Sequence, residues 1–252
     1  LMRANPGVKF AEFGTRRRFS SAWQDHAVER FAAECPANLI GTSNPWLAAK
    51  YGIAASGTNV HELGMTYAAL EEARGGNPID GQAGVIADWL ERFPSMPVVL
   101  TDTYTTDATL KLMTAEQTEQ VMSYRIDSGN ECEVGEKILH FLLKNGTDPR
   151  NRTLFFSNSL TPEKAVALHH YFDGRIQTAF GIGGNAVNNM GFDSRHDLPG
   201  MNTVSKAVDV NGYGTVKLSD DEGKHTGAAR DIARYKHHIS RLATEQLVAF
   251  AG

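Results

Sequence analysis

Polar residues of the kinds that bind anions and move protons recur directly after short apolar runs along this 252-residue chain. Arg125 and Asp127 end one such run, Asp102 ends another, and His61 follows a glycine-containing turn. In a parallel sheet wrapped by helices, the loops after the strands converge on one face, where such enzymes bind their substrates. The spacing therefore predicts one anion-lined pocket built from residues far apart in sequence.

Asp102 and Asp127 are expected to face this pocket together. A pair of carboxylates can hold ribose hydroxyls or a Mg²⁺ ion that carries phosphate oxygens. For an isolated aspartate, capping of the following helix or turn is the more common role. His61 taken alone is, in the same way, more often structural or merely exposed than catalytic. The convergence of the strand exits is what favours the catalytic interpretation for all three.

Two further groups of residues could bind the anionic parts of a substrate. Arg16 and Arg125 carry planar guanidinium groups that match a carboxylate, although a single arginine is more often half of a surface ion pair. A glycine-rich stretch can present successive backbone N–H groups to a phosphate, although it also suits a plain tight turn. The residues predicted to bind the phosphate are Ser157, Asn158, Gly181, Gly183 and Gly184.

Seven β-like runs alternate with helical patterns and must position these residues. Strands are expected at 8–13, 38–41, 53–57, 97–102, 121–127, 153–157 and 176–181. Helices are expected at 22–34, 45–51, 62–74, 83–92, 108–112, 133–145 and 162–172. The alternation predicts an α/β fold, and within it an irregular or incomplete βα barrel of about seven parallel strands.

The pattern changes after Gly184. Two β-like runs, 204–210 and 214–218, flank Asn211-Gly212, a dipeptide typical of a two-residue hairpin turn. A last amphipathic helix is expected from about residue 228 to 250. We therefore expect a barrel domain over residues 1–200, and a hairpin and helix over 201–252 that belong to a second, smaller domain and pack on the barrel or on the rest of that domain. An N-terminal segment of the parent protein is expected to be absent, because the chain begins at Leu1 and enters a strand almost at once.

Composition narrows the class of protein. A chain of this length with 41% hydrophobic residues can bury one large core. The net charge of -4, with no basic stripe beyond Arg16–Arg18, argues against a nucleic-acid partner. No apolar run approaches the ~20 residues that cross a membrane. Two distant cysteines indicate neither a disulfide framework nor a zinc site. The expected class is a cytoplasmic enzyme that acts on small molecules.

Eight ordered sequence blocks resemble the nicotinate phosphoribosyltransferase family, whose members join nicotinate to phosphoribosyl pyrophosphate in NAD biosynthesis. The blocks are 12–20, 41–44, 57–62, 101–106, 125–129, 156–158, 180–183 and 216–220. The resemblance implies an α/β barrel with a smaller domain. It also implies a reaction that forms nicotinate mononucleotide and pyrophosphate with hydrolysis of ATP, a requirement for Mg²⁺, and a homodimer.

The resemblance further implies a role for each candidate residue. His61 would be the histidine that ATP phosphorylates, and it would act in catalysis with Asp102 and Asp127, which would hold the ribose and its metal. The residues implied to bind nicotinate are Thr15, Arg16, Ser43 and Arg125. Those implied to bind the 5′-phosphate are Ser157, Asn158, Gly181, Gly183 and Gly184.

Ser43 bears on the choice of substrate. The related nicotinamide enzymes carry an aspartate at this point, and an aspartate would repel the carboxylate of nicotinate, so Ser43 favours nicotinate. Leu63, Asn130 and Gly184 depart from the family pattern. The alternatives are a non-catalytic phosphoribosyl-binding remnant and a nicotinamide phosphoribosyltransferase. Decarboxylating chemistry of the quinolinate type predicts more Arg and Lys than the cluster Arg16–Arg18 supplies.

Overall fold

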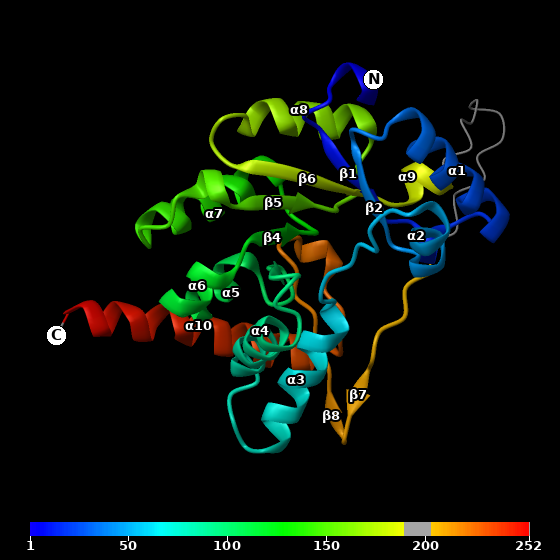
Figure 1. The fold of residues 1–252 in the computed structure, drawn as a ribbon. Helices are drawn as coiled ribbons and strands as arrows, with labels where there is room; N and C mark the ends of the chain where they lie inside the picture. Colours follow the sequence, from blue (N-terminus) through cyan, green and yellow to red (C-terminus); the bar gives the residue numbers. More distant parts are fainter. Residues whose placement is uncertain (189–202, 252) are drawn as a thin grey trace. The chain divides into compact units, whose positions relative to one another are not determined.

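The computed structural model describes residues 1–188 and 203–251, with side chains described as far as residue 242. The chain forms two compact units. Unit 1 consists of residues 1–57 and 153–205, and unit 2 consists of residues 58–152 and 206–252. Each unit combines parallel strands with helices, as Figure 1 shows, so the predicted α/β class is confirmed.

Four parallel strands form the sheet of unit 1. Their order is β2 (Leu39–Thr42), β1 (Lys9–Glu12), β6 (Gln177–Ile182) and β5 (Thr153–Phe156). In β1, β5 and β6, every residue after the first is buried. Such continuous burial is typical of parallel strands that are covered on both faces of the sheet. The ring of Phe156 stacks on Phe172 and Phe180, with centroids 5.8 and 5.7 Å away, and fills the core beside the sheet.

The longer helices of unit 1 begin after residues whose side chains cap them. The helices of this unit are α1 (Ser21–Glu34), α2 (Pro45–Tyr51), α8 (Pro162–Phe172) and the short α9 (Gly184–Val187). Thr161 caps α8 by accepting from the N–H of Lys164, with Pro162 at the first helical position, as predicted. Helix α8 packs on β6 (Figure 1).

The prediction of a strand at 53–57 is wrong. Only an isolated parallel bridge joins Ala55 to Thr42, with Thr42 N–H donating to Ala54 O at 3.0 Å and Ser56 N–H donating to Thr42 O at 2.8 Å. Ala54 and Ala55 are exposed, so a longer ladder here would bury almost no apolar side chain. Six of the seven expected strands are therefore present in the described chain, and closure of the strands into a barrel stays a prediction.

Unit 2 contains the parallel pair β3 (Val98–Leu100) and β4 (Ser123–Ile126). Its helices before residue 153 are α3 (His61–Ala73), α4 (Asp80–Arg92), α5 (Thr106–Leu112), α6 (Ala115–Gln120) and α7 (Glu131–Lys144). Helices α3 and α4 pack against each other, and α7 packs on β4 (Figure 1). Gly146, with φ 74°, follows the end of α7 at the predicted stop.

The C-terminal part of unit 2 contains a hairpin and a helix. The hairpin pairs β7 (Asp209–Val210) with β8 (Tyr213–Gly214), and φ values of 55° and 84° at Asn211 and Gly212 match the predicted two-residue turn. Helix α10 (Ala229–Ala251) follows. The apolar stripe expected on this helix packs in the core through Ile232, Tyr235, Ile239 and Leu242. The domain boundary expected near residue 200 stays a prediction.

None of the described helices combines the length and the apolar character that crossing a membrane requires.

Candidate active site

His61 is the first residue of α3 and is 7% exposed. Its Nε2 lies 3.2 Å from Asp127 Oδ2, and its Nδ1 lies 3.2 Å from Thr103 Oγ1. Burial lowers the pKa of His61 below its ordinary value, and the bond with Asp127 offsets part of this effect. The ring is therefore neutral near pH 7. We assign the proton to Nε2, because a carboxylate can only accept, and this leaves Nδ1 to accept from the Thr103 hydroxyl.

Asp127 follows β4 directly and links His61 to Arg125. The Nη2 atom of Arg125 donates to Asp127 Oδ1 at 3.1 Å. The Nη1 atom of Arg125 donates to Thr58 Oγ1 at 2.6 Å and to Asn59 O at 3.4 Å. The guanidinium group is thus held on two sides, and its orientation is fixed before any substrate arrives.

Asp102 lies two residues beyond β3 and is fully buried. Its Oδ2 accepts from the Ser128 hydroxyl and lies 3.9 Å from Lys217 Nζ. Its Oδ1 lies 3.9 Å from His61 Nε2 and accepts no hydrogen bond within the described part of the chain. This carboxylate therefore stands between the histidine and a lysine.

Neither aspartate is the N-cap of the helix that follows it. The N-cap of α5 is Thr105, whose hydroxyl accepts from the N–H of Ala108. The N-cap of α7 is Asn130, whose Oδ1 accepts from the N–H groups of Cys132 and Glu133. The helices that follow Asp102 and Asp127 are therefore capped by other residues. The departure from the family pattern at Asn130 places an effective capping residue where α7 begins.

Lys217 was given no role by the sequence reasoning. It is buried beside Asp102, and burial lowers the pKa of its amino group while Asp102 and Asp127 oppose that shift. Thr103, Ser128 and Asp220 also belong to this network and were missed as individual residues. All four lie in or beside the sequence blocks that resemble the family, so the blocks were the available signal.

The donor set does not fit a resident metal ion. Among the residues that the structure describes, no three His, Cys, Asp or Glu side chains form a group that could hold a metal. Asp127 is already engaged by His61 and Arg125, and Lys217 stands beside Asp102. The predicted metal contacts of Asp102 and Asp127 stay predictions.

In unit 1, the carboxylate of Glu12 organises the residues after β1 and β2. It is fully buried, and it accepts from Gly14 N–H at 2.6 Å, from Gln24 Nε2 at 2.9 Å and from Thr42 Oγ1 at 2.5 Å. These bonds join the turn after β1 to α1 and to β2. Glu12 and Gln24 were missed as candidates, because their roles depend on bonds between segments that are not neighbours in sequence.

Two of the predicted nicotinate residues meet in unit 1. Thr15 lies in the 3₁₀ turn η2 (Thr15–Arg17), and its hydroxyl is 2.7 Å from that of Ser43. The Thr15 N–H donates to Ser43 Oγ at 3.2 Å, and Gln24 Nε2 donates to Thr15 Oγ1 at 2.9 Å. Arg16 is exposed at the same turn. The arrangement presents hydroxyl groups next to a cationic side chain, a combination that suits a carboxylate.

The predicted phosphate residues lie at the ends of β5 and β6. Ser157 and Asn158 follow β5, and Gly183 caps the short helix α9. The Asn185 side chain donates to Leu160 O at 2.7 Å and ties the two loops together. Gly181 lies inside β6, where a Cβ would meet the rings of two phenylalanines at 3.1 Å, so packing explains this glycine. Phosphate binding by these residues stays a prediction.

The structure therefore brings the candidates together in two groups. Unit 2 assembles His61, Asp102, Arg125 and Asp127 within one polar network. Unit 1 assembles Thr15 with Ser43 and ties the loop that follows β5 to the one that follows β6. The prediction that both groups line one pocket stays a prediction.

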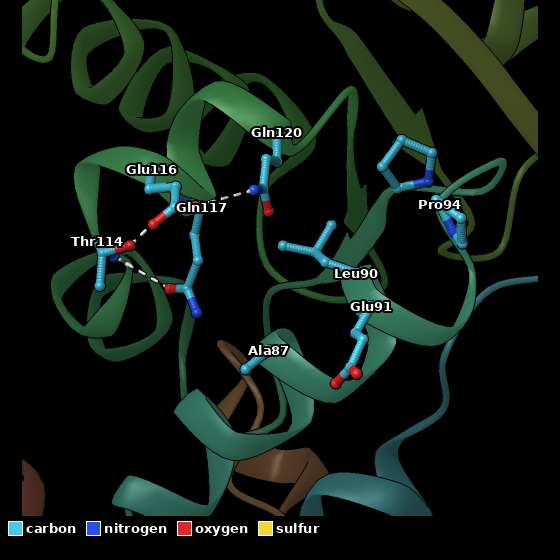
Figure 2. Close-up of a pocket in the computed structure, with 9 residues that line it drawn as sticks. Ala87, Leu90, Glu91, Pro94, Thr114, Glu116, Gln117 and Gln120 are labelled. Atoms are coloured by element: carbon cyan, nitrogen blue, oxygen red, sulfur yellow. Dashed lines mark hydrogen bonds between the residues drawn. The ribbon is translucent and has the colours of Figure 1, made fainter.

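A hollow of about 720 Å³ occurs elsewhere in unit 2. Figure 2 shows its wall formed by α4 and α6, with Glu116 and Gln120 joined by a hydrogen bond and Leu90 near the middle. None of its lining residues belongs to the network around His61. We therefore give this hollow no part in the candidate active site.

Comparison with known proteins covers nearly the whole chain. A sequence model of the nicotinate phosphoribosyltransferase (NAPRTase) family matches residues 8–243. The structure of nicotinate phosphoribosyltransferase from Porphyromonas gingivalis is similar, with 30% sequence identity and a TM-score of 0.86 over 95% of this chain and 61% of that chain. That of nicotinate phosphoribosyltransferase from Vibrio cholerae gives 29% identity and a TM-score of 0.85 over 97% and 61%. The present chain thus spans about three fifths of the length of these proteins.

Proposed function

Because this chain belongs to the nicotinate phosphoribosyltransferase family, we propose that it transfers a 5-phosphoribosyl group from phosphoribosyl pyrophosphate to the ring nitrogen of nicotinate. The products are nicotinate mononucleotide and pyrophosphate, and the reaction serves NAD biosynthesis. The single observation that carries the proposal is the network of buried His61 and Asp102 with partly buried Asp127 and Arg125, which lies wholly within the region that matches the family.

Each group in this network has a chemical task in the proposal. Departure of pyrophosphate leaves positive charge on the ribose ring, and the carboxylates of Asp102 and Asp127 stabilise that charge electrostatically. Arg125, oriented by Thr58 and Asp127, binds an anionic group of the substrate. The pyridine nitrogen attacks the anomeric carbon itself, so no nucleophile from the protein is needed.

Coupling to ATP is a further part of the proposal, and His61 is its centre. Nδ1 of the neutral ring carries the lone pair, so it is the atom that would attack the γ-phosphorus of ATP as ADP leaves. Asp127 would stabilise the proton on Nε2 while positive charge develops on the ring. The Mg²⁺ ion would arrive with the phosphates of ATP and of phosphoribosyl pyrophosphate. A homodimer and a cytoplasmic location complete the proposal.

The choice of nicotinate rests on unit 1. Thr15 and Ser43 offer neutral hydroxyl groups, and exposed Arg16 offers a positive charge. The buried carboxylate of Glu12, which lies nearby, accepts hydrogen bonds from Gly14, Gln24 and Thr42. The carboxylate of nicotinate would therefore meet donors and not a competing anion.

The test is formation of mononucleotide by the purified chain from phosphoribosyl pyrophosphate, with nicotinate or nicotinamide and with or without ATP. We expect kcat/KM to favour nicotinate by at least about tenfold, or ~1.4 kcal/mol. His61→Gln should reduce the ratio of rates with and without ATP to about one, since it removes the residue that accepts the phosphoryl group. It should also abolish acid-labile labelling by ATP that carries ³²P at the γ position.

His140→Gln is the matched control, because His140 is an exposed histidine on α7 of the same unit. It should keep both the ATP stimulation and the label. ATP stimulation that survives in His61→Gln would contradict the role of His61. Binding of phosphoribosyl pyrophosphate by calorimetry without release of pyrophosphate would instead identify a non-catalytic remnant.

A further inference from the structure

The loop after β3 contains a strained residue three positions beyond Asp102. Thr105 has φ 80° and ψ 146°, a conformation that glycine adopts readily and a β-branched residue does not. Strain of this kind persists where surrounding contacts hold the backbone in place, and it concentrates at functional sites.

Asp220 holds the next residue, Thr106, from a position 114 residues further along the chain. The N–H of Thr106 donates to Asp220 Oδ1 at 2.8 Å, and the Thr106 hydroxyl donates to Oδ2 at 2.6 Å. Both oxygens of one carboxylate thus hold the residue that follows the strained one. The Thr106 hydroxyl also lies 2.9 Å from Thr101 Oγ1, at the start of the same loop.

The backbone of Asp220 is also connected to Asp102, through two hydrogen bonds that involve Ser128. Its N–H donates to Ser128 Oγ at 3.0 Å, and the Ser128 hydroxyl donates to Asp102 Oδ2. Ser128 and Asp102 are both fully buried, so water has no direct access to replace this bond. A ring of contacts therefore runs from Asp102 through Ser128 and Asp220 to Thr106, and back along the loop.

We propose that Asp220 is a positioning residue, which fixes the carboxylate of Asp102 beside His61 by clamping the loop at Thr106 and by orienting Ser128. Without the clamp, Thr105 relaxes to an unstrained conformation and Asp102 moves from its place 3.9 Å from His61 Nε2. The catalytic consequence rests on the proposed function, whereas the positioning itself rests on the geometry alone.

Kinetics of single and double variants of the full chain test the catalytic consequence. Asp220→Asn keeps the size of the side chain, but its Nδ2 cannot accept a bond from Thr106. We expect kcat to fall about tenfold or more, with KM for nicotinate changed less than about twofold, because a misplaced catalytic group affects the chemical step. Ser128→Ala should act in the same way, and Ser128→Thr, which retains the hydroxyl, should recover part of the loss.

The double variant tests whether both contacts fix the same carboxylate. Asp220→Asn weakens the clamp on Thr106, whereas Ser128→Ala removes the hydrogen bond to Asp102. If either loss alone displaces Asp102, the double variant should lose about as much as the worse single variant, since residues that act as a unit are not additive. Asp221→Asn is the matched control: Asp221 is adjacent and pairs with Lys224 at 2.9 Å, and its replacement should leave kcat unchanged. Single losses that multiply in the double variant would overturn the proposal.

Hydrogen–deuterium exchange separates this inference from the proposed function. In Asp220→Asn, amides of residues 101–106 should exchange at least about tenfold faster than in the wild type, because the loop opens more often. Asp221→Asn should not change them. If the wild type has no transferase activity, the proposed function fails and exchange alone decides the positioning. Unchanged exchange of the amides of residues 101–106 in Asp220→Asn would overturn the positioning proposal. If Asp220→Asn does not fold, unchanged exchange in Ser128→Ala would overturn it instead.

Discussion

At the scale of single residues, Gly14 shows how little room surrounds the turn after β1. A Cβ at this position would lie 2.2 Å from Val187 Cγ2, 2.9 Å from Glu12 Oε1 and 3.0 Å from Gly183 O. These atoms belong to the segments that position Thr15 and Gly183. Gly14→Ala should therefore lower the free energy of unfolding by about 1–3 kcal/mol, the usual effect of overpacking. Urea denaturation measures this change.

Gly184→Ala provides the comparison, because among the described residues a Cβ there would meet only Arg17 Cδ, at 3.9 Å. This replacement should leave the unfolding free energy within about 0.5 kcal/mol of the wild type, because the added methyl group meets no close neighbour in the described part of the chain. The departure from the family pattern at Gly184 is thus one that the fold accepts with or without a side chain. Equal stability of the two alanine variants would contradict the packing argument for Gly14.

Residue-level prediction from sequence succeeded where a residue follows a strand directly. Asp127 and Ser43 were placed correctly after β4 and β2, because strand exits can be read from short apolar runs. Glu12 and Asp220 could not be found in this way. Their partners Gln24 and Thr106 lie 12 and 114 residues away, and hydrogen bonds over such separations exist only once the chain has folded.

At the scale of secondary structure, the start of α7 depends on Asn130. Its Oδ1 accepts from Cys132 N–H at 3.0 Å and from Glu133 N–H at 3.2 Å, which satisfies two of the free donors at the helix end. Asn130→Ala should lower the free energy of unfolding by about 1 kcal/mol, the typical effect of losing an N-cap. Thermal or urea unfolding of the purified variant provides the measurement.

Asn130→Asp is the informative partner of that variant. An aspartate can accept the same two bonds, and its charge suits the positive end of a helix. Its stability should therefore match that of the wild type to within about 0.5 kcal/mol. A loss as large as that of the alanine variant would show that the amide of Asn130, and not its capping oxygen, is what α7 requires.

Elements were predictable from sequence where capping residues and apolar periodicity agree. Helices α2 and α8 begin and end at the predicted residues, since Asn44-Pro45 and Thr161-Pro162 mark their starts. Helix α6 was missed because its six residues are mostly polar, although its capping box of Thr114 and Gln117 was visible in the sequence. The strand predicted at 53–57 is wrong, because an apolar run forms a strand only where it can pair along its length with a neighbouring strand.

At the scale of the whole chain, alternation of strands and helices was enough to predict the α/β class, but not which strands are neighbours. The order β2-β1-β6-β5 in unit 1 places β1 beside β6, which lies more than 160 residues further along the sequence. That pairing depends on long-range packing of buried faces, which a local pattern does not encode. The same long-range closure joins residues 206–252 to the segment 58–152 in unit 2.

The stability of the whole molecule should fall on acidification before its carboxylates are titrated. Burial lowers the pKa of His61, His225 and His238. A histidine with a folded pKa below its unfolded value of about 6.5 binds protons more readily in the unfolded chain. Its effect is absent well above pH ~6.5, and it destabilises the folded state progressively as the pH falls from there through the folded pKa.

His61→Gln should therefore flatten the decline in unfolding free energy between about pH 7 and 5, while His225 and His238 preserve part of the slope. Glutamine can still form hydrogen bonds with Thr103 and Asp127, so the network retains its partners. Urea denaturation at half-unit pH intervals gives the two curves, with His140→Gln as the exposed control. A decline in His61→Gln as steep as that of the wild type would show that the imidazole at this position does not resist protonation.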